Sequence, residues 1–329
     1  MFKIGEIEIN SPVLLAPMAG VTDRPFRDLV AEFGAGLVVS EMVASRELTA
    51  AHPTTQAKAE IAAGALNSSV QIVGREAHWM AEAAKLLAGQ GARIIDINMG
   101  CPARKVTNGT SGSALMRDPD YALGLIEAVV NAVDIPVTLK MRLGWDEAQM
   151  NAPDIAKRAE AAGIRMITIH GRTRCQFYKG QADWLAIRRV VGAVDVPVIA
   201  NGDIVDLESA RAALAQSGAA GVMVGRGTRG RPWLLSQIAA GLAGQPVPEA
   251  PEGAELGAII LRHYRAMLEF YGQENGTRAA RKHLDAYLNP LANARPLRDA
   301  AIRETDPDLV MDRIRRFFDA DLVKCKEAA

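Results

Sequence analysis

One of the three cysteines, Cys101, stands at the end of a short apolar run, within the segment Asp96–Pro102. A thiol on a turn can act as a nucleophile, a metal ligand or a proton donor. The loop that follows, residues 103–112, carries Arg104, Lys105 and two glycines. Taken alone, Cys101 is more often a small buried apolar residue than a reactive one. Its role therefore depends on the side chains that the fold brings near it.

Polar side chains also lie within or directly after several other strand-like runs. Lys140 and Arg142 are two residues apart in one run, so their side chains share a face. The other candidates are three amides, one imidazole and two charged groups, namely Gln71, Asn98, Asn201, His170, Asp203 and Arg226. Each has an ordinary structural explanation when taken alone. Together, unpaired polar groups at one place are costly unless a ligand fills the space.

Eight short apolar runs, alternating with helical patterns, must position these residues. The runs are residues 13–18, 37–42, 69–74, 93–98, 136–142, 166–170, 196–201 and 221–226, after a hairpin around 4–9. Helical segments include residues 26–33, 78–87, 121–132, 154–162, 185–191 and 207–216. Glycines that can close a helix in the left-handed conformation follow several segments, at Gly34, Gly91, Gly163 and Gly218. Apolar strands alternating with helices predict parallel strands buried on both faces.

This pattern predicts an α/β fold, a (β/α)8 TIM barrel, because eight such units fit within about 240 residues. A doubly wound open sheet is the alternative, but no Gly-x-Gly-x-x-Gly follows the first strand. Closely spaced prolines near residue 248 predict a linker. We expect a barrel catalytic domain over residues 1–243, a linker over 244–251 and a small all-helical C-terminal domain over 252–329.

Composition limits the class of protein. The formal net charge of the 329 residues is zero, so any argument for a nucleic-acid partner must be local. Three sparse cysteines indicate a reducing compartment, and no pair has the spacing of a metal knuckle. No signal-peptide pattern and no apolar run of about 18 residues occur. We therefore expect a cytoplasmic protein with no membrane span and no metal.

The turns after the last two strands indicate a cofactor. In many barrels the turns after the last two strands form a phosphate site from exposed backbone N–H groups and a helix N-terminus. In this chain those turns contain Gly202 and Gly225–Gly227. A flat ring against Pro17–Ala19 would make that ligand FMN. Lys140 could then stabilise the negative charge of the reduced ring, and Gln71 could bond its pyrimidine-like edge. Other phosphate-bearing cofactors or sugar phosphates would use the same turns.

Several motifs carry a resemblance to a known family. They are Pro17–Asp23, Asp96–Pro102, Leu139–Arg142, Ile169–Thr173, Ala200–Asp203, Val224–Gly227 and, in the tail, Ala280–His283. In this order and spacing the chain resembles the tRNA-dihydrouridine synthases, most closely their bacterial B-type branch, over its whole length. The Asn-x-Gly-Cys-Pro segment is specific for that family. One departure concerns the tail, where Ala286-Tyr287 stands in place of the usual Trp-Tyr pair.

The resemblance implies an FMN-binding barrel followed by a helical tRNA-binding domain, and a reaction. NADPH reduces the flavin, which gives a hydride to C6 of specific D-loop uridines, with tRNA position 17 suggested, while Cys101 gives a proton to C5. The implied catalytic residues are Cys101, Lys140, His170 and Arg142. The implied cofactor-binding residues are Pro17, Met18, Ala19, Gln71, Lys140, His170, Asn201, Gly202, Asp203, Gly225 and Arg226. The implied substrate-binding residues are Asn98, Arg142, Arg281 and Lys282.

A local excess of cations in the tail suits a phosphate backbone. The cations are Arg262, Arg265, Arg278, Arg281, Lys282, Arg295, Arg298 and Arg303. A solvated charged helix face would look the same. Two other functions stay open, an FMN-dependent reductase or dehydrogenase of a free pyrimidine and a non-catalytic RNA-binding regulator on the same fold. We expect the chain to act as a monomer.

Overall fold

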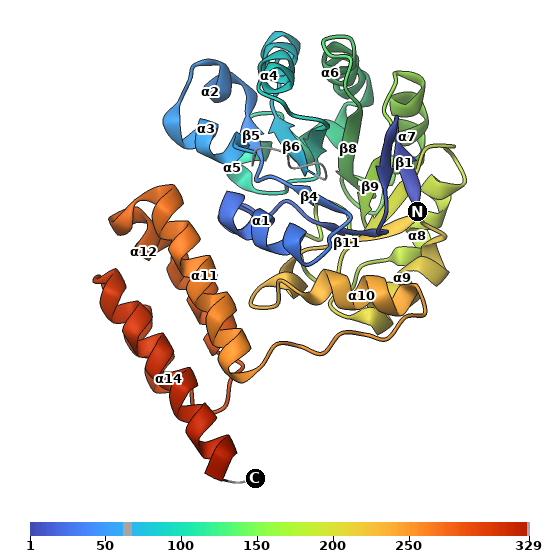
Figure 1. The fold of residues 1–329 in the computed structure, drawn as a ribbon. Coiled ribbons are helices and arrows are strands. Elements are labelled where there is room, and N and C mark those ends of the chain that lie inside the picture. Colours follow the sequence, from blue (N-terminus) through green and yellow to red (C-terminus); the bar gives the residue numbers. More distant parts are fainter. Residues whose placement is uncertain (62–67, 328–329) are drawn as a thin grey trace.

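Eight parallel strands form a closed ring in the computed structural model, which describes residues 1–61 and 68–327 (Figure 1). In chain order they are β3 (Val13–Leu15), β4 (Leu37–Val39), β6 (Ser68–Val73), β7 (Ile95–Met99), β8 (Val137–Arg142), β9 (Ile167–His170), β10 (Val198–Asn201) and β11 (Gly221–Val224). Neighbours in sequence are neighbours in the ring, and β3 pairs with β11 to close it. The predicted TIM barrel is confirmed, and the closed ring excludes the open sheet.

Helices cover the outside of the ring. They are α1 (Arg24–Glu32), α2 (Ser45–Thr49), α3 (Pro53–Ala59), α4 (Ala77–Gly89), α6 (Pro119–Val130), α7 (Ala152–Ala161), α8 (Trp184–Val191), α9 (Leu207–Ser217) and α10 (Leu234–Leu242). The glycines predicted to end helices adopt positive φ, at Gly34, Gly91, Gly163 and Gly218. The strands are buried on both faces, as their continuous apolar runs predicted.

The predicted hairpin is present as β1 (Phe2–Ile4) and β2 (Ile7–Ile9), which pair antiparallel. Ile4 and Ile9 are fully buried and pack with Ile94 and Met166, which lie at or just before the start of barrel strands. The hairpin therefore closes the end of the barrel where the strands begin. The open end, where the strands finish, is left for ligands.

The second strand departs from the prediction. The expected run 37–42 is interrupted, because β4 ends at Val39 and a separate strand, β5 (Val43–Ala44), continues alongside β6. At the break, the Ser40 hydroxyl accepts a hydrogen bond from the backbone N–H of Gln71 at 3.0 Å. A side-chain oxygen thus replaces the backbone acceptor of the ladder, which apolar periodicity cannot reveal.

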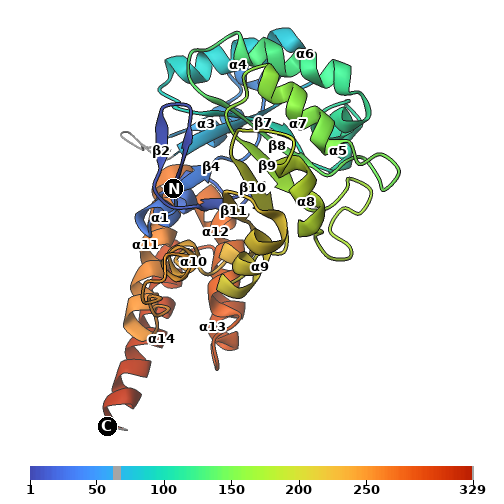
Figure 2. The same ribbon diagram turned by 90° about the vertical axis from the view of Figure 1, so that its right-hand side faces the viewer.

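Four helices follow the barrel on one side, next to α1 (Figures 1 and 2). They are α11 (Gly253–Tyr271), α12 (Gln273–Leu288), α13 (Arg295–Ala301) and α14 (Pro307–Glu327). They share an apolar cluster that also includes Leu29 and Trp233 of the barrel. Residues 243–252 carry no helix or strand, as predicted for a linker, while the functional division into domains stays a prediction. In the described ranges no helix has the length and apolarity needed to span a membrane.

Candidate active site

A cavity of about 900 Å³ opens at the carboxyl ends of the barrel strands, a size typical of cofactor and ligand sites. The predicted residues that line it are Pro17, Met18, Ala19, Gln71, Asn98, Cys101, Lys140, Arg142, His170, Asn201, Gly202, Asp203, Gly225 and Arg226. These come from strands far apart in the sequence. The structure therefore brings every predicted residue of the barrel to one place, while their individual roles stay predictions.

A chain of amides organises one wall. The buried carboxylate of Asp96 accepts hydrogen bonds of 2.6 Å from Gln71 Nε2 and from Thr138 Oγ1. Gln71 turns its nitrogen to Asp96 and its oxygen to Asn98, whose Nδ2 donates over 2.7 Å. Burial raises the pKa of the Asp96 carboxyl, and the two donors oppose that shift. The orientation of both amides is thereby determined.

The backbone around Cys101 is held from three sides. Asn98 Oδ1 accepts from the N–H groups of Gly100 at 3.1 Å and Cys101 at 2.9 Å. The Ser113 hydroxyl donates to the carbonyl of Cys101 at 2.9 Å, and Arg142 Nε donates to that of Gly100 at 2.8 Å. Cys101 itself is half-buried and lines the cavity. Its thiol is thus carried on a positioned turn.

The loop after Cys101 contains more structure than a plain connector. A short helix, α5 (Arg104–Thr107), precedes the 3-10 helix η1 (Gly112–Arg117). The Ser111 hydroxyl closes the loop on itself by donating to the carbonyl of Val106 at 2.9 Å. The basic side chains of α5 are exposed beside the cavity entrance, where closure over a substrate remains a prediction.

Lys140 and Asn201 lie side by side in the wall of the cavity and are both polar. Lys140 Nζ donates to Asn201 Oδ1 at 3.0 Å, and Asn201 Nδ2 donates to the carbonyl of Met223 at 2.8 Å. Burial and the neighbouring charge of Arg142 lower the pKa of Lys140 to about 8, although Asp96 opposes the shift. At neutral pH the ammonium group is therefore mostly protonated inside the cavity.

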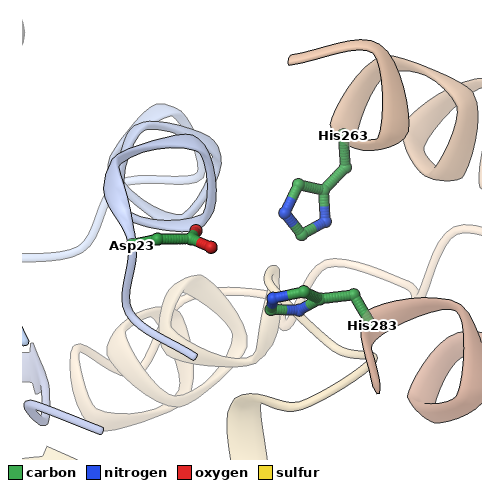
Figure 3. A group of neighbouring side chains, drawn as sticks. All are labelled: Asp23, His263 and His283. Carbon is green, nitrogen blue, oxygen red and sulfur yellow. The ribbon is translucent and has the colours of Figure 1, made fainter. Parts of the chain in front are cut away.

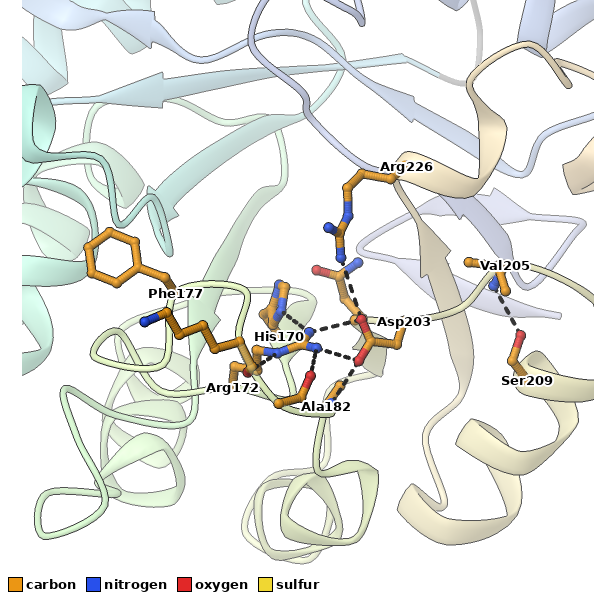
Figure 4. Close-up of polar contacts among 12 residues, drawn as sticks. His170, Arg172, Phe177, Ala182, Asp203, Val205, Ser209 and Arg226 are labelled. Atoms are coloured by element: carbon orange, nitrogen blue, oxygen red, sulfur yellow. Dashed lines mark hydrogen bonds and ion pairs between the residues drawn. The ribbon is translucent and has the colours of Figure 1, made fainter. Parts of the chain in front are cut away.

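His170 lies in a network of charges (Figure 4). The buried Arg172 donates to both carboxylate oxygens of Asp203, at 3.0 and 2.5 Å, and its Nη1 lies 3.4 Å from His170 Nε2. Arg226 lies 3.5 Å from the same carboxylate. Burial and the surrounding cations lower the pKa of His170 well below its usual value. His170 is therefore neutral, and Asp203 anchors the two arginines.

Arg142 connects the cysteine turn to the loop after β9. Its Nη1 donates to the carbonyls of Thr173 and Phe177, both at 2.9 Å. The guanidinium carbons of Arg142 and Arg226 lie 5.6 and 5.3 Å from the ring centre of Tyr178. Burial lowers the pKa of Arg142 to about 10, so it stays charged at neutral pH. Tyr178 thus stands between two cations at the cavity wall.

The predicted phosphate turns are shaped by glycine. Gly202 has φ +111°, and a Cβ added there would stand 2.9 Å from the nearest side-chain carbon, so only glycine fits. Gly225 precedes a single 3-10 turn, η2 (Arg226–Thr228). Arg229 and Arg231 also line this part of the cavity. Backbone and guanidinium donors therefore gather at these turns.

Two predicted substrate-binding residues, Arg281 and Lys282, do not line the cavity. They lie half-buried on α12. A Cβ added at Gly20, in the loop after β3, would stand 3.8 Å from Lys282 Nζ. Helix α12 also packs closely on the loop after β11. A Cβ added at Gly230 would stand 2.2 Å from the carbonyl oxygen of Ala286. The tail is therefore in direct contact with two loops of the cavity rim.

Sequence reasoning missed several residues of the site, among them Asp96, Tyr178 and Arg229. Asp96 was available, because it lies two residues before Asn98 on the same face of a buried strand and is charged. Tyr178 and Arg229 lie in loops whose paths no local pattern encodes. A charged residue inside an apolar strand was the one usable signal.

A closed barrel with a polar cavity at its strand ends, glycine-shaped turns and a partly buried lysine defines a class of cofactor-dependent barrel enzymes. The chain belongs to the dihydrouridine synthase family, whose model matches residues 14–320. Like the other members of this family, it is a flavin-dependent oxidoreductase. The resemblance drawn from the motifs is confirmed.

Similar proteins agree with this placement. The chain is 62% identical to a probable tRNA-dihydrouridine synthase of Rhodobacter capsulatus, over 96% of this chain and 97% of the relative. It is 44% identical to tRNA-dihydrouridine synthase B of Pseudomonas syringae pv. tomato, over 96% and 94%. Among solved structures, a 2-naphthoyl-CoA reductase aligns with TM-score 0.57 at 14% identity, over 74% of this chain and 52% of that one. That likeness shows the barrel fold.

Proposed function

We propose that this protein uses FMN and NADPH to reduce the C5–C6 double bond of specific D-loop uridines in tRNA to 5,6-dihydrouridine. The observation that carries the proposal is the convergence of Cys101, Lys140 and the glycine turns on one cavity, in a member of this family. The resemblance of the motifs to the B-type branch suggests tRNA position 17 as the target. We expect the protein to act as a cytoplasmic monomer.

The cavity fits FMN in size and in chemistry. The Gly202 and Gly225 turns, with Arg226 and Arg229, offer donors for the phosphate. Small and apolar residues at Pro17–Ala19 give a flat surface for the ring. Lys140 supplies a positive charge inside the cavity for the electron-rich edge of a reduced ring. The amide of Gln71, already oriented by Asp96, keeps one N–H for that ring.

A flavin bound there would supply hydride transfer, from NADPH to C6 of the uracil. The chain then has to deliver a proton to C5, where negative charge develops. We assign this role to Cys101, which lines the cavity on a turn that is held by Asn98 and Arg142. Neutral His170 accepts from Arg172 and is not a competing cationic acid.

The uracil itself needs orientation and access. Three of the five N–H donors of Arg142 are used by backbone carbonyls. Its two Nη2 donors are left for the carbonyl oxygens of the base. The Tyr178 side chain lines the same cavity and bounds the space left for the base. A uridine in the folded tRNA must be turned out of its stack to reach this depth, as in other base-modifying enzymes.

We assign catalysis to residues 1–243 and tRNA binding to residues 252–329. Part of the cationic excess of the tail is neutralised, because Arg262 pairs with Glu32 at 2.8 Å and Arg298 pairs with Asp285. Among the described residues, no carboxylate lies within ion-pair distance of Arg278 or Arg265, and both are exposed. These arginines are therefore available to phosphates.

The test is Cys101→Ala, with Cys175→Ala as a matched control at an exposed cysteine. We expect Cys101→Ala to keep FMN binding and NADPH oxidation but to lose most reduction of unmodified tRNA, measured by dihydrouridine content. The control should match wild type. A Cys101→Ala variant that reduces uridine at the wild-type rate would remove Cys101 as the acid.

Free uracil serves as the second substrate in the same assay. Turnover of uracil alone, without tRNA, would favour the free-pyrimidine reductase. A colourless protein that cannot be reconstituted with FMN would favour the RNA-binding regulator. A map of dihydrouridine positions in tRNA from cells with and without the gene would identify the target uridine.

A further inference from the structure

Three buried side chains converge outside the cavity, where the barrel meets the tail (Figure 3). Asp23 caps the N-terminus of α1, His263 lies on α11 and His283 lies on α12. One ligand atom of each lies within 4.8 Å of the other two. None of the three lines the cavity. Their convergence therefore needs an explanation other than the proposed reaction.

The two imidazoles leave polar atoms unsatisfied. His263 and His283 are 2% and 3% exposed, and within the described part of the chain neither Nε2 atom has a hydrogen-bond partner. A buried nitrogen without a partner costs free energy comparable to a lost hydrogen bond. The rings nevertheless lie together, with centroids 4.6 Å apart. A ligand that both nitrogens could bind would remove this cost.

Neighbouring groups hold the three side chains in orientation. His263 Nδ1 lies 3.1 Å from the hydroxyl of Tyr287, so its other nitrogen, Nε2, is the one left for a ligand. The hydroxyl of Tyr271 donates to Asp23 Oδ2 at 3.2 Å. Phe26 packs against both imidazole rings, at 5.6 and 5.3 Å. Oriented outer partners of this kind are typical of metal sites.

The protonation states suit ligation. Burial, with the nearby cations Lys282 and Arg262, lowers the pKa of His263 to about 3. Burial and the neighbouring imidazole and cations lower that of His283 well below its usual value. Both rings are therefore neutral at physiological pH and keep a lone pair. Asp23 has a pKa raised by burial to about 6, so it is mostly ionised at neutral pH.

We propose that Asp23, His263 and His283 bind a divalent transition-metal ion, with zinc as the expected ion. Two imidazoles and one carboxylate are a ligand set for zinc and similar ions, and not for calcium or magnesium, which take oxygen ligands. This inference departs from the sequence expectation of no metal. Its ligands are far apart in the chain, so no short spacing motif announces it.

The charges around the cluster sharpen the choice of ion. Lys282 and Arg262 lie near the histidines, while Glu41 adds to the negative charge of Asp23. Simple electrostatic attraction for a cation is therefore weak here, and affinity must come from coordination bonds. Metal–ligand distances of about 2.0–2.1 Å place ligand atoms about 3.3 Å apart, so binding draws the three side chains closer.

The position of the site indicates a structural role. An ion there would link α1 of the barrel to α11 and α12 of the tail, and three protein ligands leave a fourth position for water. It would hold helix α12, which carries Arg281 and Lys282, at one orientation to the cavity. This role is independent of the reaction proposed for Cys101.

The test uses the full-length protein, purified without a metal-affinity step. We expect mass spectrometry of the metal content to find zinc in proportion to protein. After the zinc has been removed by a chelator, titration of zinc in competition with a chromophoric chelator should show saturable binding to the protein. Substitution by Co²⁺ should give a visible absorption band that indicates nitrogen ligands. Asp23→Asn and His283→Gln should bind at least about tenfold more weakly, since even losing an outer partner costs that much. His78→Gln, at an exposed histidine of α4, should match wild type.

A wild-type protein that takes up no zinc, or variants that bind it as well as wild type, would overturn the proposal. If the variants misfold, hydrogen exchange on the wild-type protein decides. Zinc should then slow exchange in α1, α11 and α12 and leave the barrel strands β8–β10 unchanged. Equal exchange in these helices with and without zinc would count against the site.

Discussion

Replacing Asn98 by alanine tests whether the amide chain positions the proton donor. The Asn98 side chain makes three hydrogen bonds with nitrogen or oxygen partners, to Gln71 Oε1 at 2.7 Å and from the N–H groups of Gly100 and Cys101 at 3.1 and 2.9 Å, beside a weak contact of its Nδ2 with Met42 Sδ at 4.0 Å. Asn98→Ala removes all three and releases the turn that carries the thiol. The Asp96–Gln71 pair remains, so the wall that we propose to face the flavin stays in place.

The size of the effect follows from these bonds. A net contribution of about 0.5–1.5 kcal/mol for each hydrogen bond gives about 1.5–4.5 kcal/mol for the three. If the transition state needs the turn in its present position, every 1.4 kcal/mol costs about tenfold in rate. We therefore expect uridine reduction to slow by roughly one to three orders of magnitude, with about a hundredfold as the central value.

Two half-reactions separate positioning from general damage. Stopped-flow absorbance measures flavin reduction by NADPH, which should stay within about twofold of wild type, and single-turnover oxidation of the reduced enzyme by tRNA should carry the loss. Asn131→Ala, at an exposed asparagine after α6, is the control for the substitution itself. An equal loss in both half-reactions, or an unchanged oxidation by tRNA, would refute the positioning argument.

Three further outcomes are expected. Burial and Arg142 lower the pKa of Lys140 to about 8, so its positive charge is lost as pH rises through about 8. The rate of flavin reduction, measured by stopped flow, should fall in that pH range, whereas the Lys140→Met variant should be slow at every pH. Gly202→Ala puts φ +111° on alanine and its Cβ 2.9 Å from that of Ala182, so FMN titration should show at least about tenfold weaker binding, and unchanged affinity would contradict the contact. Arg278→Glu should weaken tRNA binding several-fold in filter assays and reduce its salt dependence without slowing flavin reduction.

Much of the fold and the site could be predicted because a barrel has one rule of assembly. All strands run in parallel, so whatever follows each strand meets at one end. Lys140 and Asn201 are far apart in the chain, yet both follow from reading strand ends, and they are 3.0 Å apart. The glycine at 202 was equally visible, since a turn with positive φ needs that residue.

The remainder depends on contacts that no period encodes. The break at Ser40 comes from one hydroxyl replacing a backbone acceptor. The place of Tyr178 depends on the path of a loop between β9 and α8. The meeting of His263 and His283 with Asp23 depends on how the tail docks on the barrel, which is a property of packed surfaces and not of any one segment.

The way the ring closes has a consequence for how the protein is made. Residues 13–15 form the first strand of the barrel, and their partner on one side, residues 222–224, is among its last parts to be synthesised. Until then the growing chain is an open parallel sheet whose edge can pair with another chain. The same late segment carries Gly225 and Arg226 of the proposed phosphate site. A chain that stops before Gly221 would therefore be an aggregation-prone sheet without a cofactor site, and not a smaller version of the enzyme.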